Sequence, residues 1–194
     1  MPYGSGLHRS ERVLPEPGPA FAYTPENLQE FEKVVQRYPA EHRRSAILPA
    51  LHLVQAQQGY ITGNSMAYVA ERIGCSRADV EDMVSFYTMY FTRPVGTYVL
   101  QVCRTLSCAL CGAERITEAL EEKLGIRAGQ TDPTGTFTLL EVECLGACDR
   151  APVIMVNDDW HECARPEDVD TLIEGLRTRG PAALTGCHLH VEKD

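Results

Sequence analysis

Two stretches of the sequence decide the fold: residues 98–108, YVLQVCRTLSC, and residues 137–148, FTLLEVECLGAC. In each, a run rich in β-branched and aromatic residues, typical of a strand, leads directly into two closely spaced cysteines. The four cysteines are Cys103, Cys108, Cys144 and Cys148. If the two strands are neighbours in one sheet, both loops leave it at the same end and the four sulfur atoms can converge. Gly146 lies inside the second loop, where the backbone has to bend tightly around a bulky group.

Four thiolates are the ligand set of a [2Fe–2S] cluster, and this set uses both loops symmetrically. A fifth cysteine, Cys111, follows three residues after Cys108, so three other combinations of the cysteines remain open. A plant-type ferredoxin would use Cys111 in place of Cys148, and a thioredoxin-type dithiol would pair Cys111 with Cys108. A zinc knuckle would combine Cys108 and Cys111 with the second pair, although the two pairs lie further apart than is usual for such sites.

The remaining cysteines carry weaker signals. Free cysteine is among the most buried residue types, so we interpret Cys75 and Cys163 as packed side chains. Cys187, His188 and His190 resemble a ligand cluster, but they lie on a terminal tail, where we expect adventitious metal binding rather than a built site.

The composition excludes several classes of function. The chain has 194 residues, with 18 Lys and Arg against 27 Asp and Glu, a formal net charge of −9. This balance argues against a nucleic acid or an anionic membrane as the main partner. No apolar run approaches the ~20 residues of a membrane span, and the first twenty residues lack the apolar core of a secretory signal. We expect a cytoplasmic chain with no direct membrane insertion, in which grouped cysteines indicate metal or cluster chemistry. The sequence has no glycine-rich nucleotide-binding motif.

The chain is expected to divide into a helical and an α/β part. The predicted segments are an extended or disordered arm at 1–23, a helical bundle domain at 24–94, a thioredoxin-like domain at 95–180 and a C-terminal tail at 181–194. Four helices are predicted in the bundle. The first begins after Thr24, the second spans Ser45–Gln58 and the third spans Ser65–Ile73. The fourth begins after Ser76, which forms a capping box with Asp79.

After the turn at Pro94 the pattern changes to strand, helix, strand, strand, strand, helix. Strands are predicted at 98–102, 137–142, 152–156 and 160–162, and helices at 113–124 and from Pro166 onward. The fold class is therefore α+β: a small N-terminal helical bundle followed by a thioredoxin-like α/β domain that carries a [2Fe–2S] cluster.

Several motifs together resemble a known family. They are residues 47–51 (ILPAL) with 57–61, residues 84–87 (VSFY), residues 101–108 and, most specifically, residues 143–148 (ECLGAC) running on into 151–157. Over roughly residues 25 to 190 the chain resembles the thioredoxin-like [2Fe–2S] subunit, the 24 kDa or E subunit, of respiratory complex I, NADH:quinone oxidoreductase.

The resemblance implies an electron-transfer iron–sulfur subunit with one [2Fe–2S] cluster on Cys103, Cys108, Cys144 and Cys148 and no complete active site of its own. It implies two partners, a flavin subunit that binds NADH and FMN and a multi-cluster iron–sulfur subunit. The chain would lie at the inner face of the cell membrane through the membrane arm of the complex. Two alternatives remain: the equivalent diaphorase subunit of an NAD-linked hydrogenase or formate dehydrogenase, and a zinc-stabilised interaction module.

Overall fold

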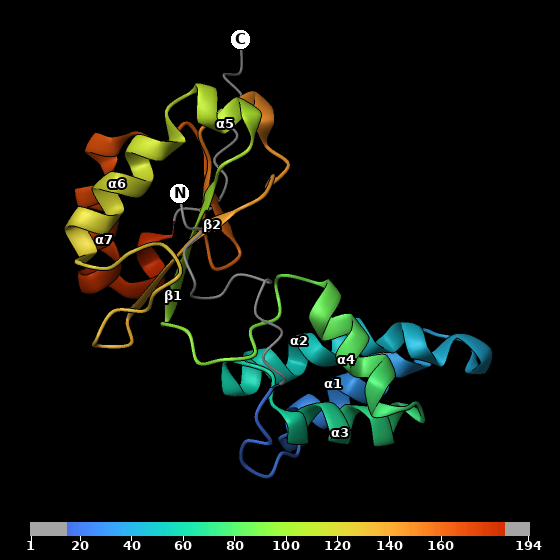
Figure 1. The fold of residues 1–194 in the computed structure, drawn as a ribbon. Coiled ribbons are helices and arrows are strands. Elements are labelled where there is room, and N and C mark those ends of the chain that lie inside the picture. The colour runs from blue at the N-terminus through green and yellow to red at the C-terminus, as the bar shows by residue number, and fades with distance from the viewer. Residues whose placement is uncertain (1–14, 185–194) are drawn as a thin grey trace. The chain divides into compact units, whose positions relative to one another are not determined.

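The computed structural model describes residues 15–184, which form two compact units, one ending at Pro94 and the other starting at Val95. Each unit has its own hydrophobic core, and the two sets of core residues do not overlap. Both units are coloured by residue number in Figure 1. Within the described residues, no helix is both long enough and apolar enough to span a bilayer.

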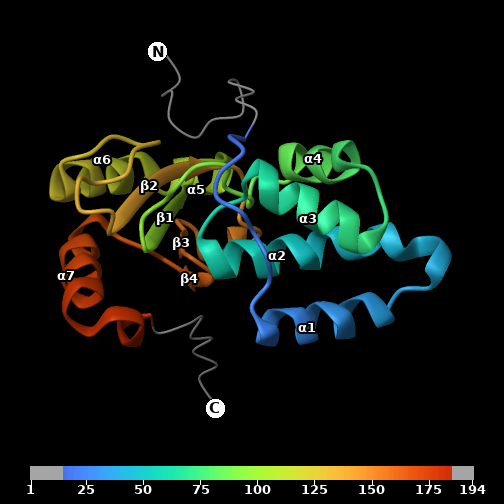
Figure 2. The ribbon, with the colours of Figure 1, turned by 90° about the horizontal axis from the view of Figure 1, so that it is seen from below.

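The first unit is helical. Its α-helices are α1 (Pro25–Gln36), α2 (Ile47–Gln58), α3 (Gly63–Ile73) and α4 (Arg77–Phe86), and a 3-10 segment covers Ala40–Ala46. In Figure 2, α2 lies between α1 on one side and α3 and α4 on the other. The fully buried Leu51 and Val54 of α2 lie in the core that the helices share. A small helical bundle is therefore present, as predicted.

Side-chain caps set two of the helix starts as the sequence indicates. The Thr24 hydroxyl accepts a hydrogen bond from the Asn27 N–H at 3.2 Å at the start of α1. At the start of α4, the Ser76 hydroxyl accepts from the Asp79 N–H at 3.2 Å, and the Asp79 carboxylate accepts from the Ser76 N–H at 3.0 Å. Both caps satisfy backbone donors that the first helical turn leaves free.

Two other boundaries differ from the prediction. Helix α3 starts at Gly63, because Thr62 is its cap and Ser65 is the reciprocal partner in the capping box. The predicted helix at 45–58 starts at Ile47, after the 3-10 segment, which places Pro49 in the first turn of α2. Proline is tolerated there because its missing N–H would have no intrahelical partner.

The described part of the predicted arm has no helix or strand, yet it is tied to the helical unit. The backbone carbonyls of Glu16 and Pro17 accept hydrogen bonds of 2.8 Å from the first residues of α3. The ring of Tyr23 meets the ring of Tyr68 edge-on, with centroids 5.3 Å apart. These contacts extend the core of the helical unit beyond its helices.

The second unit combines a four-stranded sheet with three α-helices within residues 95–184. The strands are β1 (Tyr98–Cys103), β2 (Phe137–Val142), β3 (Ile154–Val156) and β4 (Asp159–His161), and the helices are α5 (Leu106–Leu110), α6 (Ala113–Leu124) and α7 (Val169–Arg179). The strand order is β2-β1-β3-β4, with β1 parallel to β2 and the other pairs antiparallel. Helices α6 and α7 pack side by side on one side of the sheet (Figure 1).

The predicted elements of this unit are confirmed, with shifted ends. Strand β3 begins at Ile154 rather than Pro152, since a proline has no N–H to donate to the ladder. Strand β4 begins one residue early, at Asp159, and a 3-10 turn at Pro166–Asp168 precedes α7. Helix α5 was not predicted, because five residues are too few to show a helical period.

Gly96 brings β1 close to β2. A Cβ atom at this position would lie 2.7 to 2.9 Å from the backbone of Phe137, so only glycine fits without displacing the strand. The Gly96 N–H donates to the Thr138 hydroxyl at 2.6 Å, in the interior of the unit. This contact holds the N-terminal end of β1 against β2 and thereby supports the parallel register on which the site depends.

Candidate metal centre

The four predicted cysteines lie at the carboxyl end of two paired strands. Strands β1 and β2 are parallel, and their last residue pair is Cys103 with Val142. The loop after β1 leads through α5, which carries Cys108, and the loop after β2 carries Cys144 and Cys148. The expectation that the strands are neighbours and that both loops leave the sheet at one end is therefore confirmed.

The sulfur atoms are arranged in two pairs. The Sγ atoms of Cys144 and Cys148 are 3.4 Å apart, and the thiols of Cys103 and Cys108 lie close enough for each to shift the pKa of the other. The pairs lie close enough for the charge on Cys103 to act on Cys148. Across residues 15–184, no three His, Cys, Asp or Glu side chains surround one position for a single metal ion. A [2Fe–2S] cluster has two irons, each taking two of the four protein ligands, so two sulfur pairs fit it.

The two pairs differ in burial. Cys103 and Cys108 are 1% and 2% exposed and belong to the core of the α/β unit. Cys144 and Cys148 are exposed. We call Cys103 and Cys108 the inner pair, because they are buried in the core, and Cys144 and Cys148 the outer pair, because they are exposed to solvent.

Hydrogen bonds make the inner pair electrostatically unequal. Burial acts to raise the pKa of Cys103, but hydrogen bonds from the side chain and backbone of Thr105 and from the Leu145 backbone outweigh it, and the pKa is lowered. Burial and the hydrogen bond with Cys103 raise the pKa of Cys108 to about 11, against the effect of the Val153 backbone. As the pH rises, the Cys103 thiol therefore loses its proton before the Cys108 thiol does.

The outer pair follows the same pattern. The Gly146 N–H, 3.4 Å from the Cys144 sulfur, and then the Cys148 side chain lower the pKa of Cys144. The hydrogen bond to Cys144, and then its charge, raise the pKa of Cys148. Gly146 has φ +87°, a left-handed conformation that glycine adopts without strain, which agrees with its predicted role in the bend. Metal binding requires deprotonated thiols, and here donors to the sulfur atoms are already in place.

Two hydroxyl groups in the first loop also contact the sulfur atoms and were not identified from the sequence. The Thr105 Oγ1 lies 3.2 Å from the Cys103 sulfur and also lowers the pKa of Cys144. The Ser107 side chain acts on the Cys148 thiol in the direction that lowers its pKa, against the larger effect of Cys144. The only signal in the sequence is the presence of two hydroxyl residues between Cys103 and Cys108, which gives no indication of contacts with the other loop.

The other cysteines lie outside these pairs. Cys111 is exposed, at the end of α5. Cys75 packs partly buried against the helical core, as expected. The expectation that Cys163 is packed is wrong, because its side chain is exposed. Its backbone is in a left-handed conformation, with φ 50°, and its N–H donates to the Arg150 carbonyl. The motif at Cys187, His188 and His190 lies outside the described residues.

Comparison with known proteins places this arrangement in a family. The model of the thioredoxin-like [2Fe–2S] ferredoxins matches residues 31–177. The chain belongs to this family. The predicted thioredoxin-like fold and the predicted iron–sulfur class of cofactor are thereby confirmed.

Relatives of this ferredoxin include subunits of a respiratory enzyme. The E subunit numbered 2 of the NADH-quinone oxidoreductase of Rhizobium meliloti is 45% identical over 149 residues, which are 77% of this chain and 88% of the relative. NADH-quinone oxidoreductase subunit 2 of Thermus thermophilus is 43% identical over 154 residues, 78% and 85% of the two chains. The predicted resemblance, to the E subunit of an oxidoreductase complex, is confirmed.

A solved structure shows the same fold in another context. An NAD⁺-reducing [NiFe]-hydrogenase in the air-oxidized state matches with a TM-score of 0.62 at 20% sequence identity, over 70% of this chain and 23% of the hydrogenase chain. At that identity the match shows a shared fold only. The relatives above 40% identity therefore favour the NADH-quinone oxidoreductase function over the hydrogenase alternative.

Proposed function

We propose that this ferredoxin is the electron-transfer subunit of an NADH-quinone oxidoreductase and that Cys103, Cys108, Cys144 and Cys148 hold its [2Fe–2S] cluster. The observation that carries the proposal is the pairing of these sulfur atoms where two parallel strands end. The hydrogen-bond donors directed at the sulfurs and the family of the chain support it.

When bound, the cluster takes up and releases one electron at a time. The chain's own residues would provide a fixed frame for it. Cys103 and Cys108 would hold one iron from the core of the α/β unit, where the surrounding side chains exclude water. Cys144 and Cys148 would hold the other iron at the surface. The N–H groups of Leu145 and Gly146 would donate to the thiolates and stabilise their negative charge.

The partners follow from what the chain lacks and from its relatives. The sequence carries no glycine-rich nucleotide-binding motif, so NADH and FMN would bind to a separate flavin subunit. The relatives are subunits of NADH-quinone oxidoreductases, which supports a complex containing that flavin subunit and a multi-cluster iron–sulfur subunit. The chain would then be held at the membrane through other subunits of the complex.

The first test is the content of iron, zinc and acid-labile sulfide per chain, measured on protein purified without oxygen. We expect about two irons and two sulfides, the composition of one [2Fe–2S] cluster. Zinc without sulfide would instead make the chain a zinc-stabilised interaction module and would contradict the proposal.

The ligand set is tested by a matched pair of cysteine substitutions. Cys148→Ala removes one sulfur of the outer pair and should abolish the native cluster, since one iron loses a ligand. Cys111→Ala removes an exposed cysteine outside the pairs and should leave iron, sulfide and the visible spectrum unchanged. The opposite pattern would show that Cys111 is the fourth ligand, as in a plant-type ferredoxin.

A further inference from the structure

Thr105 has a hydroxyl group that its helix does not use. It occupies the N-cap position of α5, where a threonine side chain commonly accepts a hydrogen bond from a backbone N–H two or three residues on. Here the side chain makes no capping hydrogen bond. Its Oγ1 lies 3.2 Å from the Cys103 sulfur instead. The hydroxyl is therefore directed at the metal centre and contributes nothing to the cap.

The same hydroxyl reaches both sulfur pairs. Besides lying 3.2 Å from the sulfur of Cys103 of the inner pair, it is near enough to Cys144 of the outer pair, in the loop after β2, to lower the pKa of that thiol. A hydroxyl has a single hydrogen, so between two thiolates that hydrogen has to be shared or exchanged. The Leu145 backbone, in the loop after β2, also lowers the pKa of Cys103, so a second influence across the loops remains when the Thr105 hydroxyl is removed.

We propose that the Thr105 hydroxyl is a positioning group shared by the two sulfur pairs, which ties the two loops together and raises the reduction potential of the site. The proposal rests on the proposed ligand set. A donor to a thiolate sulfur withdraws negative charge, and the reduced form carries one more negative charge than the oxidised form. Hydrogen bonds to sulfur therefore favour reduction.

The test compares Thr105→Val, which removes the hydroxyl and nearly keeps the shape, with Thr105→Ser, which keeps the hydroxyl. Thr178→Val is the matched control, because the Thr178 hydroxyl donates to the Glu174 carbonyl within α7. The full-length chain of each is assayed for iron and sulfide, for the melting temperature of the apoprotein and for the midpoint potential in a dye-mediated titration followed by absorption or electron paramagnetic resonance.

In Thr105→Val, we expect the ratio of reduced to oxidised protein at a fixed solution potential to fall roughly three- to tenfold. A tenfold fall corresponds to about 59 mV for a one-electron couple. Thr105→Ser should restore the ratio, and Thr178→Val should leave it unchanged. If Thr105→Val loses the cluster while Thr105→Ser retains it and the apoproteins melt alike, the hydroxyl is needed to hold the two pairs, which also supports the proposal.

A full cluster with an unchanged potential in Thr105→Val would overturn the inference. So would loss of the cluster in both Thr105→Val and Thr105→Ser, because the hydroxyl is present in the second variant. These results differ from a failure of the proposed function itself, which would appear as unsubstituted protein that holds no iron and sulfide.

Discussion

A single buried nitrogen makes the stability of the α/β unit depend on pH. The Nε2 atom of His161, on β4, is buried and has no hydrogen-bond partner in the described part of the chain. Burial lowers the pKa of this imidazole below its ordinary value of 6.5, and the nearby Asp159 carboxylate acts weakly in the other direction. His161 therefore stays neutral in the folded protein at neutral pH.

The sign of the pH effect follows from proton binding. Just below pH 6.5 the unfolded chain binds a proton at His161 and the folded protein does not, so the free energy of unfolding decreases as the pH falls. We expect urea midpoints of the wild-type protein to fall between pH 7 and pH 5 and His161→Gln to flatten that profile. His42→Gln, at an exposed histidine, is the control. Parallel profiles for His161→Gln and the wild type would contradict this prediction.

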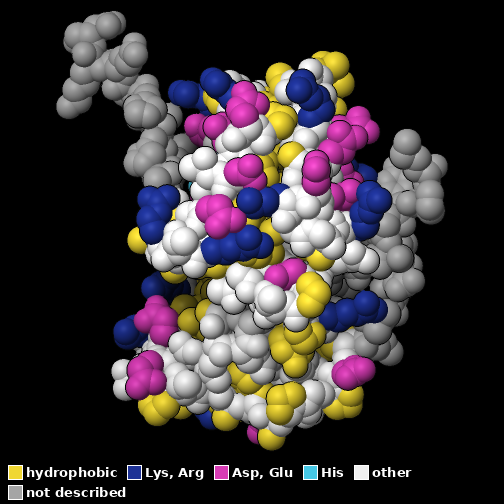
Figure 3. Space-filling view, turned by 90° about the vertical axis from the view of Figure 1, so that its left-hand side faces the viewer, with side chains coloured by type: hydrophobic (Ala, Val, Ile, Leu, Met, Phe, Trp, Pro, Cys, Tyr) yellow, Lys and Arg dark blue, Asp and Glu magenta, His cyan; other side chains and the backbone are white. Residues whose placement is uncertain are grey.

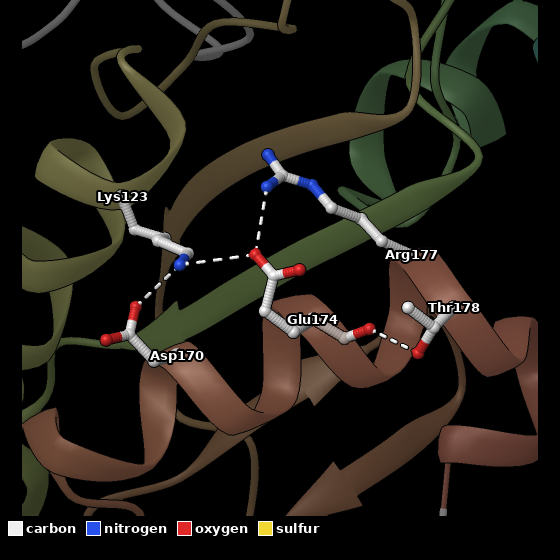
Figure 4. A network of polar contacts seen from close by, with 5 residues as sticks. All are labelled: Lys123, Asp170, Glu174, Arg177 and Thr178. Atoms are coloured by element: carbon white, nitrogen blue, oxygen red, sulfur yellow. Dashed lines mark hydrogen bonds and ion pairs between the residues drawn. The ribbon is translucent and has the colours of Figure 1, made fainter.

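At the scale of the elements, α6 and α7 are joined both by ion pairs and by apolar packing. Lys123 of α6 lies 2.9 Å from Asp170 and 3.2 Å from Glu174 of α7, and Glu174 also pairs with Arg177 at 3.1 Å (Figure 4). Acidic and basic side chains are interspersed on this face in Figure 3. In contrast to these surface charges, Leu120 of α6 is fully buried in the core that α6 shares with α7 and the sheet.

We expect the packing to outweigh the ion pairs. Leu120→Ala should lower the free energy of unfolding by about 2–5 kcal/mol, because it leaves a cavity in a closed core. Lys123→Gln should have a much smaller effect that disappears at high salt, since the side chains of Asp170 and Glu174 are 76% and 52% exposed and solvent screens their charges. Urea unfolding at low and high salt measures both variants. Equal losses for the two would show that the network, not the core, holds α6 to α7.

Elements with a strong local signal could be predicted from the sequence, and those with non-local causes could not. The cap at Ser76 and the two strands that lead into cysteine pairs are visible in a few adjacent residues. The five-residue helix α5 has no such signal. The four cysteines could be proposed as ligands from the sequence because each pair follows a strand, but the effect of Thr105 on Cys144 depends on the parallel pairing of β1 with β2.

At the scale of the whole molecule, the chain has two hydrophobic cores, and only one of them includes cysteines of the proposed ligand set. The core of residues 15–94 contains no cysteine of the proposed ligand set, whereas Cys103 and Cys108 are part of the core of residues 95–184. A ligand that binds only the folded state stabilises the unit that binds it. Because the proposed cluster holds two loops and the ends of two strands, its contribution to stability should be confined to the second unit.

Removing the iron from the full-length protein with a chelator and a reductant tests this directly. We expect amide hydrogen exchange in β1, α5, β2 and the loop at 143–153 to accelerate on the order of tenfold or more, since their local opening no longer requires release of the metal. Exchange in α1 to α4 should stay unchanged, because their core is formed without the cluster. The exchange is followed by mass spectrometry of the same sample before and after iron removal. Equal acceleration in both units would mean that they unfold as one, and the division of stability at Pro94 would have to be abandoned.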